Sequence, residues 1–426
     1  MEKVNLGILG MGTVATGLIN IIEMNHSKIE ETLGKSIGIS KVLVNNLHKK
    51  RNVNLSTDIY TDNAYEVIDD KCADIIVELI GGIDPAYEYI KRALANKKHV
   101  VTANKALIAT HGKELEELAF INGVELMYEA SVAGGIPVLN TLNDNLVANE
   151  IEKIAGIING TTNYILTQMS DNGLEYEQAV KQAQDLGFAE ADPSSDVDGD
   201  DAAYKIALLA KTAFGQRINI SDIPKEGITK ISKEDMSYAK EFGYSIKLIA
   251  SASASRSDRE IELRVHPAFV PVGHPLSTVK NEFNAVFLKG NAVGELMLYG
   301  KGAGSLPTGS AVLGDVMSII KGGESYTHKV YEDKYKVVNR AYKPYYIRLE
   351  VIDKPGVLGK IADVFGSHGI SLGSVMQRQK NGNKEIAPLV FITHEIERKN
   401  IDAALEEIKK LEDVVRICSI IVVEEF

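Results

Sequence analysis

The sequence is short of cysteine, of basic residues and of long apolar runs. Its two cysteines, Cys72 and Cys418, lie far apart, which excludes a disulfide framework and a CxxC metal site. No apolar run reaches the roughly 18 residues that a membrane helix needs, and no apolar segment before a cleavage site opens the chain. With 47 basic against 58 acidic residues, the net charge of −11 argues against nucleic-acid binding. We therefore expect a cytoplasmic protein with reduced thiols that binds neither membranes nor nucleic acids.

The 426 residues are too many for one domain, and their patterns divide the chain into three blocks. Residues 1–135 alternate short apolar runs with amphipathic stretches, which predicts a parallel α/β sheet with crossover helices. Residues 136–321 mix helices and strands, and we expect helix 310–320 to pack on an open sheet of this block. Residues 322–345 are polar and predict a linker. Residues 346–426 follow the order βαββαβ, which is typical of a ferredoxin-like domain.

A glycine turn of the form G-x-G-x-x-A follows the first apolar run, 4–9. Gly10 permits a tight turn, Gly12 lets the backbone approach a pyrophosphate, and Ala15 allows close packing of helix on strand. The helix that follows would offer free N–H groups and partial positive charge to the phosphates. The turn therefore predicts a Rossmann-type dinucleotide site, although a glycine turn that only packs would look the same. The turn residues expected at the cofactor are Gly10, Met11, Gly12, Thr13 and Val14.

The end of the second apolar run bears on which nucleotide binds. A site for NAD usually has an acidic residue there for the ribose diol, but this chain has Asn45 and Asn46. Lys49, Lys50 and Arg51 follow shortly afterwards, and basic groups suit a 2′-phosphate. The pattern favours NADP and leaves NAD open, because a solvated basic loop has the same composition.

Two lysines are placed for acid–base chemistry. Lys205 is the only charged residue in the apolar stretch 202–210, and Asp201 lies four positions before it on the same helical face. An ammonium that is partly desolvated but held charged by a carboxylate suits proton donation to a carbonyl oxygen. Lys105 follows the strand 99–101, at the sheet edge where ligands bind in open α/β sheets. For both lysines a solvated surface residue is the alternative interpretation.

Seven ordered motifs give the chain a resemblance to homoserine dehydrogenases over nearly its whole length. The family reduces aspartate 4-semialdehyde to homoserine with NADPH or NADH, a step of threonine, methionine and isoleucine biosynthesis. The resemblance implies a substrate-binding and dimerisation domain at 136–321. The motifs are GILGMGTVATG at 7–17, ELIGG at 78–82, VTANKAL at 101–107, YEASVAGGIPV at 128–138, GIINGTTNYIL at 156–166, GFAEADPSSDVDGDDAAYK at 187–205 and GKGAGSLPTGSAVLGD at 300–315.

The resemblance also implies roles for single residues. Lys205 would be the proton donor, Lys105 a second acid or base between nicotinamide and substrate, and Asp201 their acidic neighbour. Glu190 would bind the amino group of the substrate, with the other substrate residues being Asp196, Gly156, Asn159, Gly160 and Thr161. Further cofactor residues would be Asn45, Arg51, Ile80, Gly81, Thr102, Lys105, Gly304 and Ser305. A structural monovalent cation, typically sodium, would lie near Glu129, Val132, Gly134 and Ile136, bound largely by main-chain oxygens.

The C-terminal block, 346–426, resembles an ACT domain, with residues 351–358 as the strand–turn–helix signature. Such domains pair side by side and bind amino acids at the shared edge. Threonine, as the end product of the pathway, is the expected effector. A dimerisation module without a ligand is the alternative. Because an extended edge strand needs covering, we expect a homodimer or homotetramer. No kinase segment precedes the first block, so a monofunctional enzyme is expected. We also expect a chain without residues 346–426 to stay active and to lose its threonine response.

Two alternatives to the expected activity stay open: a dehydrogenase of another small amino acid, and an amino-acid sensor that has lost turnover. The presence of Lys105, Lys205 and Glu190 argues against the sensor. Aspartate-semialdehyde dehydrogenase is disfavoured because it needs a thiolate nucleophile, and Cys72 and Cys418 are poorly placed for that role.

Overall fold

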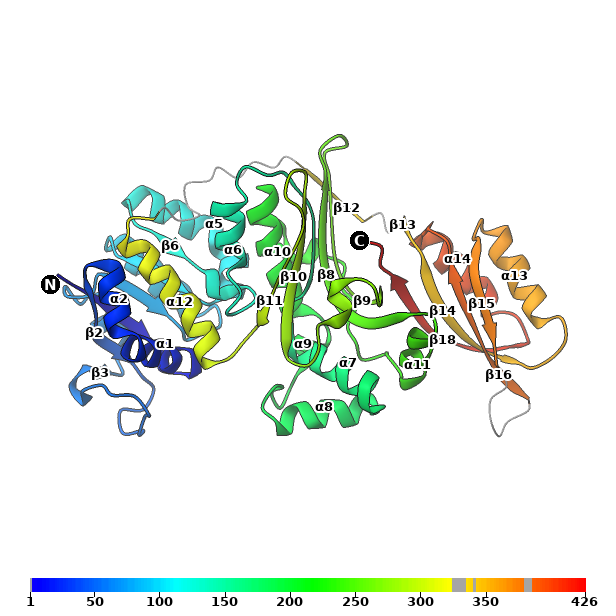
Figure 1. The fold of residues 1–426 in the computed structure, drawn as a ribbon, viewed down its shortest axis with the longest axis horizontal. Helices are drawn as coiled ribbons and strands as arrows, with labels where there is room; N and C mark the ends of the chain where they lie inside the picture. The colour runs from blue at the N-terminus through cyan, green and yellow to red at the C-terminus, as the bar shows by residue number, and fades with distance from the viewer. Residues whose placement is uncertain (1, 324–334, 340–341, 379–384) are drawn as a thin grey trace.

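The computed structural model describes residues 2–323, 335–339, 342–378 and 385–426. The molecule is elongated, with an N-terminal parallel sheet at one end, a long antiparallel sheet in the middle and a small α+β domain at the other end (Figure 1). No helix in these ranges is long and apolar enough to cross a membrane.

The first sheet has the strand order β3-β2-β1-β4-β5-β6, and all its pairings are parallel. The order reverses between β1 and β4, which is the switch point where doubly wound sheets bind their ligands. This confirms the Rossmann-type sheet predicted for the first block. The strands are β1 (Lys3–Leu9), β2 (Ser36–Leu43), β3 (Tyr60–Thr61), β4 (Ile75–Glu78), β5 (His99–Thr102) and β6 (Leu126–Met127); the helices are α1 (Thr13–Met24), α2 (His26–Leu33), α3 (Ala64–Ile68), α4 (Ala86–Ala95) and α5 (Lys105–Asn122).

The middle of the molecule is an antiparallel sheet in the order β11-β10-β7-β8-β9. Helices from the sequence between β7 and β8 pack on it, so this part has the expected α+β character. The strands are β7 (Ile151–Ile157), β8 (Tyr244–Ser255), β9 (Glu260–Pro271), β10 (Phe283–Gly290) and β11 (Gly294–Lys301); the helices are α6 (Val138–Asn140), α7 (Gly160–Asn172), α8 (Tyr176–Asp185), α9 (Ser194–Val197), α10 (Asp200–Phe214) and α11 (Lys233–Glu241).

Helix α12 (Ser305–Ile320) lies elsewhere than the sequence suggested. We expected residues 310–320 to pack on the second sheet, but Val312, Val316 and Ile319 join the core of the first sheet, beside α1. Gly17 and Gly309 allow this close packing, because a Cβ on Gly17 would lie 1.9 Å from the Ser305 carbonyl oxygen and a Cβ on Gly309 would lie 2.6 Å from the Leu18 nitrogen. The chain thus returns to the first sheet after completing the middle one.

The C-terminal block has the ferredoxin-like strand order β18-β14-β16-β15, which confirms the predicted fold. Its outer strand β18 pairs in parallel with β9, with Val422 opposite Ala268 and Val423 opposite Phe269, so the middle and C-terminal sheets are continuous. The strands are β14 (Tyr345–Ile352), β15 (Leu372–Gln377), β16 (Ile386–Thr393), β17 (Ile396–Glu397) and β18 (Val414–Val423); the helices are α13 (Val357–Ser367) and α14 (Arg398–Ile408).

The predicted linker 322–345 is structured where it is described. Strand β12 (Lys336–Val338) pairs with β9, and β13 (Tyr342–Lys343) pairs with β17. The sequence did not predict these short strands, because they form only by pairing with strands far along the chain. The rest of the predicted linker, 324–334 and 340–341, lies outside the described residues.

The C-terminal block also shares its core with the middle sheet. The ring of Tyr346 stacks on Phe269 with centroids 4.4 Å apart, and both side chains are fully buried. Phe426 stacks on His274 at 3.6 Å. A chain without residues 346–426 would therefore expose Phe269 and the edge of β9. The expectation that such a chain stays active remains a prediction.

Candidate active site

A cavity of about 690 Å³ lies where the first sheet, the helices of the middle domain and the loop before α12 meet. The first sheet contributes the ends of its strands, as expected for a site at the switch point. Residues predicted from the sequence make up much of its lining: Val14, Lys105, Gly134, Asn159, Gly160, Thr161, Asp196, Asp201, Lys205, Gly304 and Ser305.

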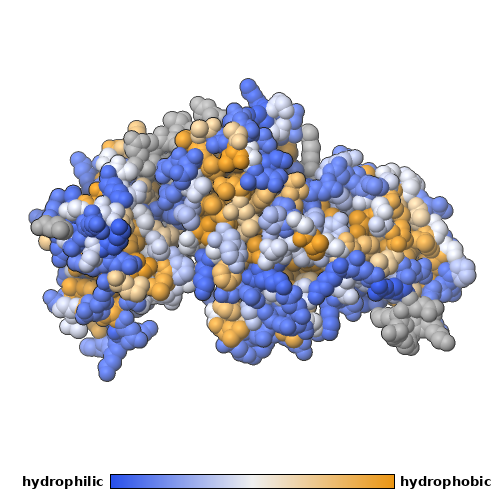
Figure 2. Space-filling view, viewed as in Figure 1, coloured by the Kyte–Doolittle hydropathy of each residue, from blue (hydrophilic) through white to orange (hydrophobic). Residues whose placement is uncertain are grey.

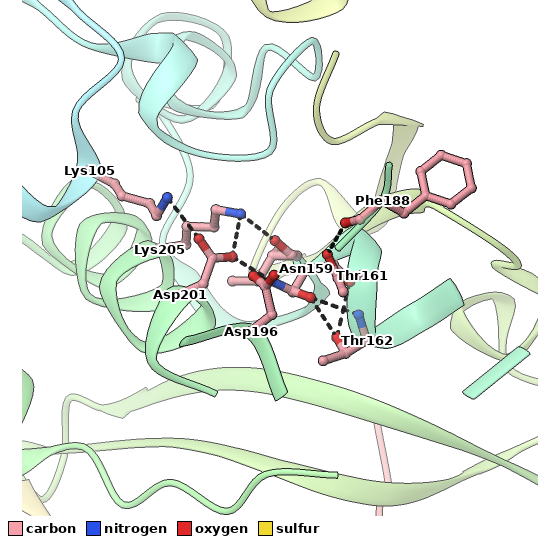
Figure 3. Close-up of polar contacts among 9 residues, drawn as sticks. Lys105, Asn159, Thr161, Thr162, Phe188, Asp196, Asp201 and Lys205 are labelled. Carbon is pink, nitrogen blue, oxygen red and sulfur yellow. Dashed lines mark hydrogen bonds and ion pairs between the residues drawn. The ribbon is translucent and has the colours of Figure 1, made fainter. Parts of the chain in front are cut away.

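One carboxylate joins the two predicted lysines (Figure 3). Asp201 Oδ2 accepts a hydrogen bond from Lys205 Nζ at 2.7 Å, and its Oδ1 lies 2.9 Å from Lys105 Nζ. Lys205 also donates to the Ile158 carbonyl oxygen at 2.8 Å. An ammonium has three N–H donors, so these contacts leave one N–H of Lys205 for a ligand in the cavity. The predicted Lys105–Asp201–Lys205 cluster is thus one hydrogen-bonded unit.

Burial and charge set the protonation of this unit. Burial would raise the pKa of Asp201, but Lys205 and Lys105 outweigh it and hold that pKa well below the ordinary value. For Lys105, burial would lower the pKa, but the charge of Asp201, followed by Asp196 and Glu190, raises it. The cluster therefore holds an ionised carboxylate and a protonated Lys105 at neutral pH.

Asn159 orients the acids. It is the N-cap residue of α7, where its Oδ1 accepts from the Thr162 N–H at 2.8 Å. Its Nδ2 donates to Asp196 Oδ1 at 2.6 Å and to Asp201 Oδ2 at 2.9 Å. Burial raises the pKa of Asp196, and the hydrogen bond from Asn159, which lowers it, offsets only part of this effect. Thr161 donates to the Phe188 carbonyl oxygen at 2.7 Å, which ties the start of α7 to the loop after α8.

The glycine turn has the form that a nucleotide needs. Gly10 has φ +99°, and a Cβ there would lie 2.7 Å from the Ile80 side chain, so only glycine fits. At Gly12, in contrast, a Cβ would meet nothing within 4 Å, which leaves open space beside the turn. The turn can therefore take a pyrophosphate against the N-terminus of α1.

A buried carboxylate shapes the neighbouring loop after β4. Glu78 Oε1 accepts from the N–H groups of Ile80 and Gly81, at 2.8 and 3.1 Å. Its Oε2 accepts from the Thr102 hydroxyl at 2.6 Å. The hydroxyl of Thr102 is thus turned to Glu78 inside the protein, and Ile80 and Gly81 are fixed beside the glycine turn.

The second glycine-rich loop reaches the first one. Ser305 Oγ donates to the Thr13 carbonyl oxygen at 2.8 Å, and Gly304, with φ +122°, precedes it. A Cβ on Gly302 would lie 2.0 Å from Asn284 Nδ2, so the loop also needs glycine there. This loop lines the cavity and lies against the start of α1.

Several predicted residues lie outside the cavity lining. Glu190 is exposed, although its charge reaches Lys105. Gly156 is inside β7, and Asn45 is exposed after β2. Arg51 donates to the carbonyl oxygens of Asn46 and Lys49, both at 2.7 Å, and its guanidinium lies 4.8 Å from the Tyr60 ring centroid. The sequence could not show that these residues lie outside the cavity lining.

The segment predicted to hold a cation is buried beside the cavity. The Glu129 carboxylate already accepts from the N–H groups of Leu139 and Asn140, at 2.9 and 2.6 Å. A cation in this segment would therefore have main-chain carbonyl oxygens as suitable ligands, since each has two lone pairs. The described residues contain no group of three or more His, Cys, Asp or Glu side chains that could hold a metal.

Glu282 and Lys301 also line the cavity, and the sequence reasoning missed both. Lys301 directly precedes the second glycine loop, which was a usable signal. Glu282 had no such signal, because long-range contacts bring its loop to the start of α7. Asn163 Nδ2 donates to the Asn281 carbonyl oxygen at 2.9 Å, and buried Lys247 donates to Asn163 Oδ1 at 3.1 Å.

A glycine turn at the switch point of a parallel sheet, followed by Val14 in the same cavity as an ammonium–carboxylate cluster, is typical of an NAD(P)-dependent oxidoreductase. Comparison with known proteins gives the particular family. The NAD-binding domain of homoserine dehydrogenase matches residues 10–129, homoserine dehydrogenase matches 137–317, and the ACT domain matches 345–413. The chain belongs to the homoserine dehydrogenase family.

Individual relatives match the chain over most or all of its length. Homoserine dehydrogenase of Bacillus subtilis is 43% identical, over 98% of both chains. The crystal structure of a homoserine dehydrogenase from Thiobacillus denitrificans has a TM-score of 0.91 and 38% identity, covering 100% of this chain and 99% of that one. A hyperthermophilic archaeal homoserine dehydrogenase in complex with NADPH has a TM-score of 0.63 and 27% identity, covering 76% and 99%.

Proposed function

We propose that the cavity reduces aspartate 4-semialdehyde to homoserine, and the reverse, with Lys205 as the catalytic acid and base. The observation that carries this proposal is the position of Lys205, whose ammonium lines the cavity while Asp201 and Ile158 take two of its three donors. When bound, the nicotinamide supplies the hydride for the aldehyde carbon. Lys205 then stabilises the charge that develops on the aldehyde oxygen and transfers its proton to it.

Asp201 and Lys105 support this step. Asp201 fixes the Lys205 ammonium in place and keeps Lys105 charged. Lys105 adds a second positive charge between the strand ends and the substrate, and it serves as the second acid or base. Asp196, Asn159, Gly160 and Thr161 line the substrate side, and Glu190, whose charge reaches Lys105, is assigned to the substrate amino group. Gly156 supports this side from β7.

For the cofactor we propose NADP, with NAD as an alternative coenzyme. Asn45 and Asn46 stand after β2 where an acid would select NAD, and Lys49, Lys50 and Arg51 follow shortly afterwards. The archaeal relative's structure contains NADPH. The nucleotide would contact Gly10–Val14, Asn45, Arg51, Ile80, Gly81, Thr102, Gly304 and Ser305. We further propose a monovalent cation, sodium by preference, held by main-chain oxygens near Glu129, Val132, Gly134 and Ile136, with a structural role.

We propose that the C-terminal domain binds threonine as an effector and that the enzyme is a homodimer or homotetramer. Strand β11 has a strand partner on one side only in the described chain. Figure 2 shows apolar residues gathered at the surface of the middle part of the molecule. Tyr299 on β11 and Val293 just before it are exposed. Such an edge is stabilised when a second copy covers it.

Absorbance at the nicotinamide band tests the reaction directly. The enzyme is given homoserine with NADP or with NAD, and aspartate 4-semialdehyde with the reduced nucleotides. We expect turnover in both directions and a higher kcat/KM with NADP than with NAD. Turnover of another small hydroxy amino acid but not of homoserine would contradict the proposed substrate, and a preference for NAD would contradict the cofactor assignment alone.

A further inference from the structure

Helices α5 and α10 carry the two lysines of the candidate active site, and they pack against each other (Figure 1). Helix α5 belongs to the first domain and begins at Lys105, whereas α10 belongs to the middle domain and has Asp201 in its first turn. The contact of 2.9 Å between Lys105 Nζ and Asp201 Oδ1 joins these two helix starts at the cavity. Anything that fixes one helix against the other therefore also fixes this contact.

A second ion pair joins the same two helices inside the protein. The Glu116 carboxylate on α5 accepts a hydrogen bond from Lys211 Nζ on α10, and these residues are only 3% and 5% exposed. At a rise of about 1.5 Å per residue, Glu116 lies roughly 16 Å from Lys105 along α5. Lys211 lies roughly 15 Å from Asp201 along α10. Because these spacings match, the two ion pairs hold the helices together at both ends of one contact.

Tyr128 adds a third segment to this buried ion pair. Its hydroxyl donates to Glu116 Oε1 at 2.9 Å and accepts from Lys211 Nζ at 3.1 Å. Shortly after Tyr128, Ala130 and Ser131 line the active cavity. Glu116, Lys211 and Tyr128 therefore connect three segments of the chain, and each of these segments reaches the cavity.

An ion pair at this place is better suited to fix a position than to add stability. The desolvation of two buried charges offsets much of their attraction, so an apolar pair of the same size would stabilise the fold about as well. Hydrogen bonds, however, need defined distances and angles, and the bonds among Glu116, Lys211 and Tyr128 form at one register of the two helices. Apolar side chains would allow the helices to slide along each other.

We propose that Glu116 and Lys211 are positioning residues, which hold α10 against α5 so that Asp201 stays in contact with Lys105. The consequence for turnover rests on the proposed function, but the contact itself does not. Without the buried pair the start of α10 can move, and Lys105 loses the carboxylate that keeps it charged. Lys205 keeps its bond to Asp201, since both lie on α10. The effect therefore falls on Lys105.

The test is the rate at which acetic anhydride acetylates Lys105 in the full-length protein at pH 9, followed by mass spectrometry. Only the neutral amine reacts, so the rate increases when the pKa of Lys105 falls. The variants are Glu116→Gln and Lys211→Met. Lys211→Met leaves Glu116 with Arg217, whose Nη2 donates to Oε2 at 3.1 Å, so the buried carboxylate stays paired and the fold is kept.

We expect Lys105 to react about fivefold faster in both variants than in the wild type, because burial without Asp201 favours the neutral amine. We expect kcat for aspartate 4-semialdehyde to fall about tenfold, because the second ammonium is displaced. The matched control is Glu114→Gln, which removes an exposed carboxylate of the same helix that pairs with Lys91 on α4. Lys105 in this control should react at the rate of the wild type.

Unchanged reactivity of Lys105 in both variants would overturn the proposal, even if their melting temperatures fall, because the buried pair would then only stabilise the fold. Faster reaction in Glu114→Gln as well would also overturn it, since any change on α5 would then have the same effect. If Glu116→Gln does not fold, Lys211→Met decides alone. If the wild type does not turn over aspartate 4-semialdehyde, the proposed function fails, and the acetylation rates still decide this proposal.

Discussion

At the scale of single residues, the candidate active site depends on one carboxylate, that of Asp201, which pairs with two ammonium groups. Each oxygen of Asp201 faces a different lysine, and Asn159 supplies a further donor. Burying a carboxylate alone would be costly, and these partners offset that cost. The same contacts fix both lysines, which is what a proton transfer in a fixed direction needs.

Replacing Asp201 by asparagine should change the pH dependence of turnover. Without that charge, burial dominates at Lys105 and its pKa falls. We expect the basic limb of the kcat/KM profile to move to lower pH in Asp201→Asn, and kcat to fall by about a hundredfold. Steady-state rates between pH 6 and 11 measure both effects.

The control for this variant is Asp200→Asn, which removes the neighbouring aspartate that pairs with Lys225. Its profile should match the wild type. A basic limb at the same pH in Asp201→Asn and in the wild type would mean that Asp201 does not keep Lys105 charged.

At the scale of elements, the close approach of α1 and α12 joins the two glycine-rich loops of the cavity. The Gly17 position faces the Ser305 carbonyl oxygen, and Ser305 in turn bonds the Thr13 carbonyl oxygen. A small shift of α12 would therefore move the second loop away from the nucleotide. The packing of these helices is part of the binding site.

Two alanine substitutions in this helix pair should have opposite effects on stability. Gly17→Ala places a Cβ 1.9 Å from the Ser305 oxygen and should cost about 1–3 kcal/mol, with weaker binding of the nucleotide. Gly314→Ala on α12 meets nothing within 4 Å and should stabilise the protein by about 0.5–1 kcal/mol. Urea unfolding and nucleotide titration measure both. Equal stability of the two variants would show that α1 and α12 do not pack as described.

The sequence predicted local features of these elements better than their packing. The alternating runs before residue 135 and the glycine turn are local signals, and the sheet order agrees with them. The lysine pair and Asp201 were found because spacing on one helix and position at a strand end are also local. The packing of α12 on α1 was not predicted, since its apolar face would fit either sheet. Glu282 was missed for the same reason, because its loop reaches the cavity only through tertiary contacts.

At the scale of the whole molecule, the C-terminal domain is built into the catalytic one. Strand β18 continues the middle sheet, and Glu424, the residue after it, is buried against β9. Its carboxylate lies 3.2 Å from both His266 Nε2 and Lys343 Nζ. The sequence could not predict that the two sheets are continuous, since only two residue pairs of parallel ladder join them. The continuous sheet connects the C-terminal domain directly to the catalytic one.

Glu424 should therefore support stability in a pH-dependent way. Burial would raise its pKa, but His266, Lys343 and Lys153 lower it from 4.5 to about 2. Because the folded-state pKa is the lower one, this stabilisation is present above pH 4.5 and is lost as the pH falls towards 2. Glu424→Gln should cost about 3 kcal/mol at pH 7 and less at pH 3.

Urea unfolding at the two pH values measures this difference, with Glu425→Gln as the matched control because Glu425 is exposed. The control should unfold like the wild type. An equal loss for Glu424→Gln at pH 7 and pH 3 would contradict an ionised Glu424 as the source of the stabilisation.

The most direct test of the account is the turnover number of Lys205→Ala for the reduction of aspartate 4-semialdehyde, measured together with NADPH affinity. The account predicts a loss of kcat of about a hundredfold to ten-thousandfold, while NADPH binds within twofold of the wild type, because Lys205 lines the cavity and is proposed to contact the substrate and not the nucleotide. Turnover close to that of the wild type would contradict the role of Lys205 as the proton donor.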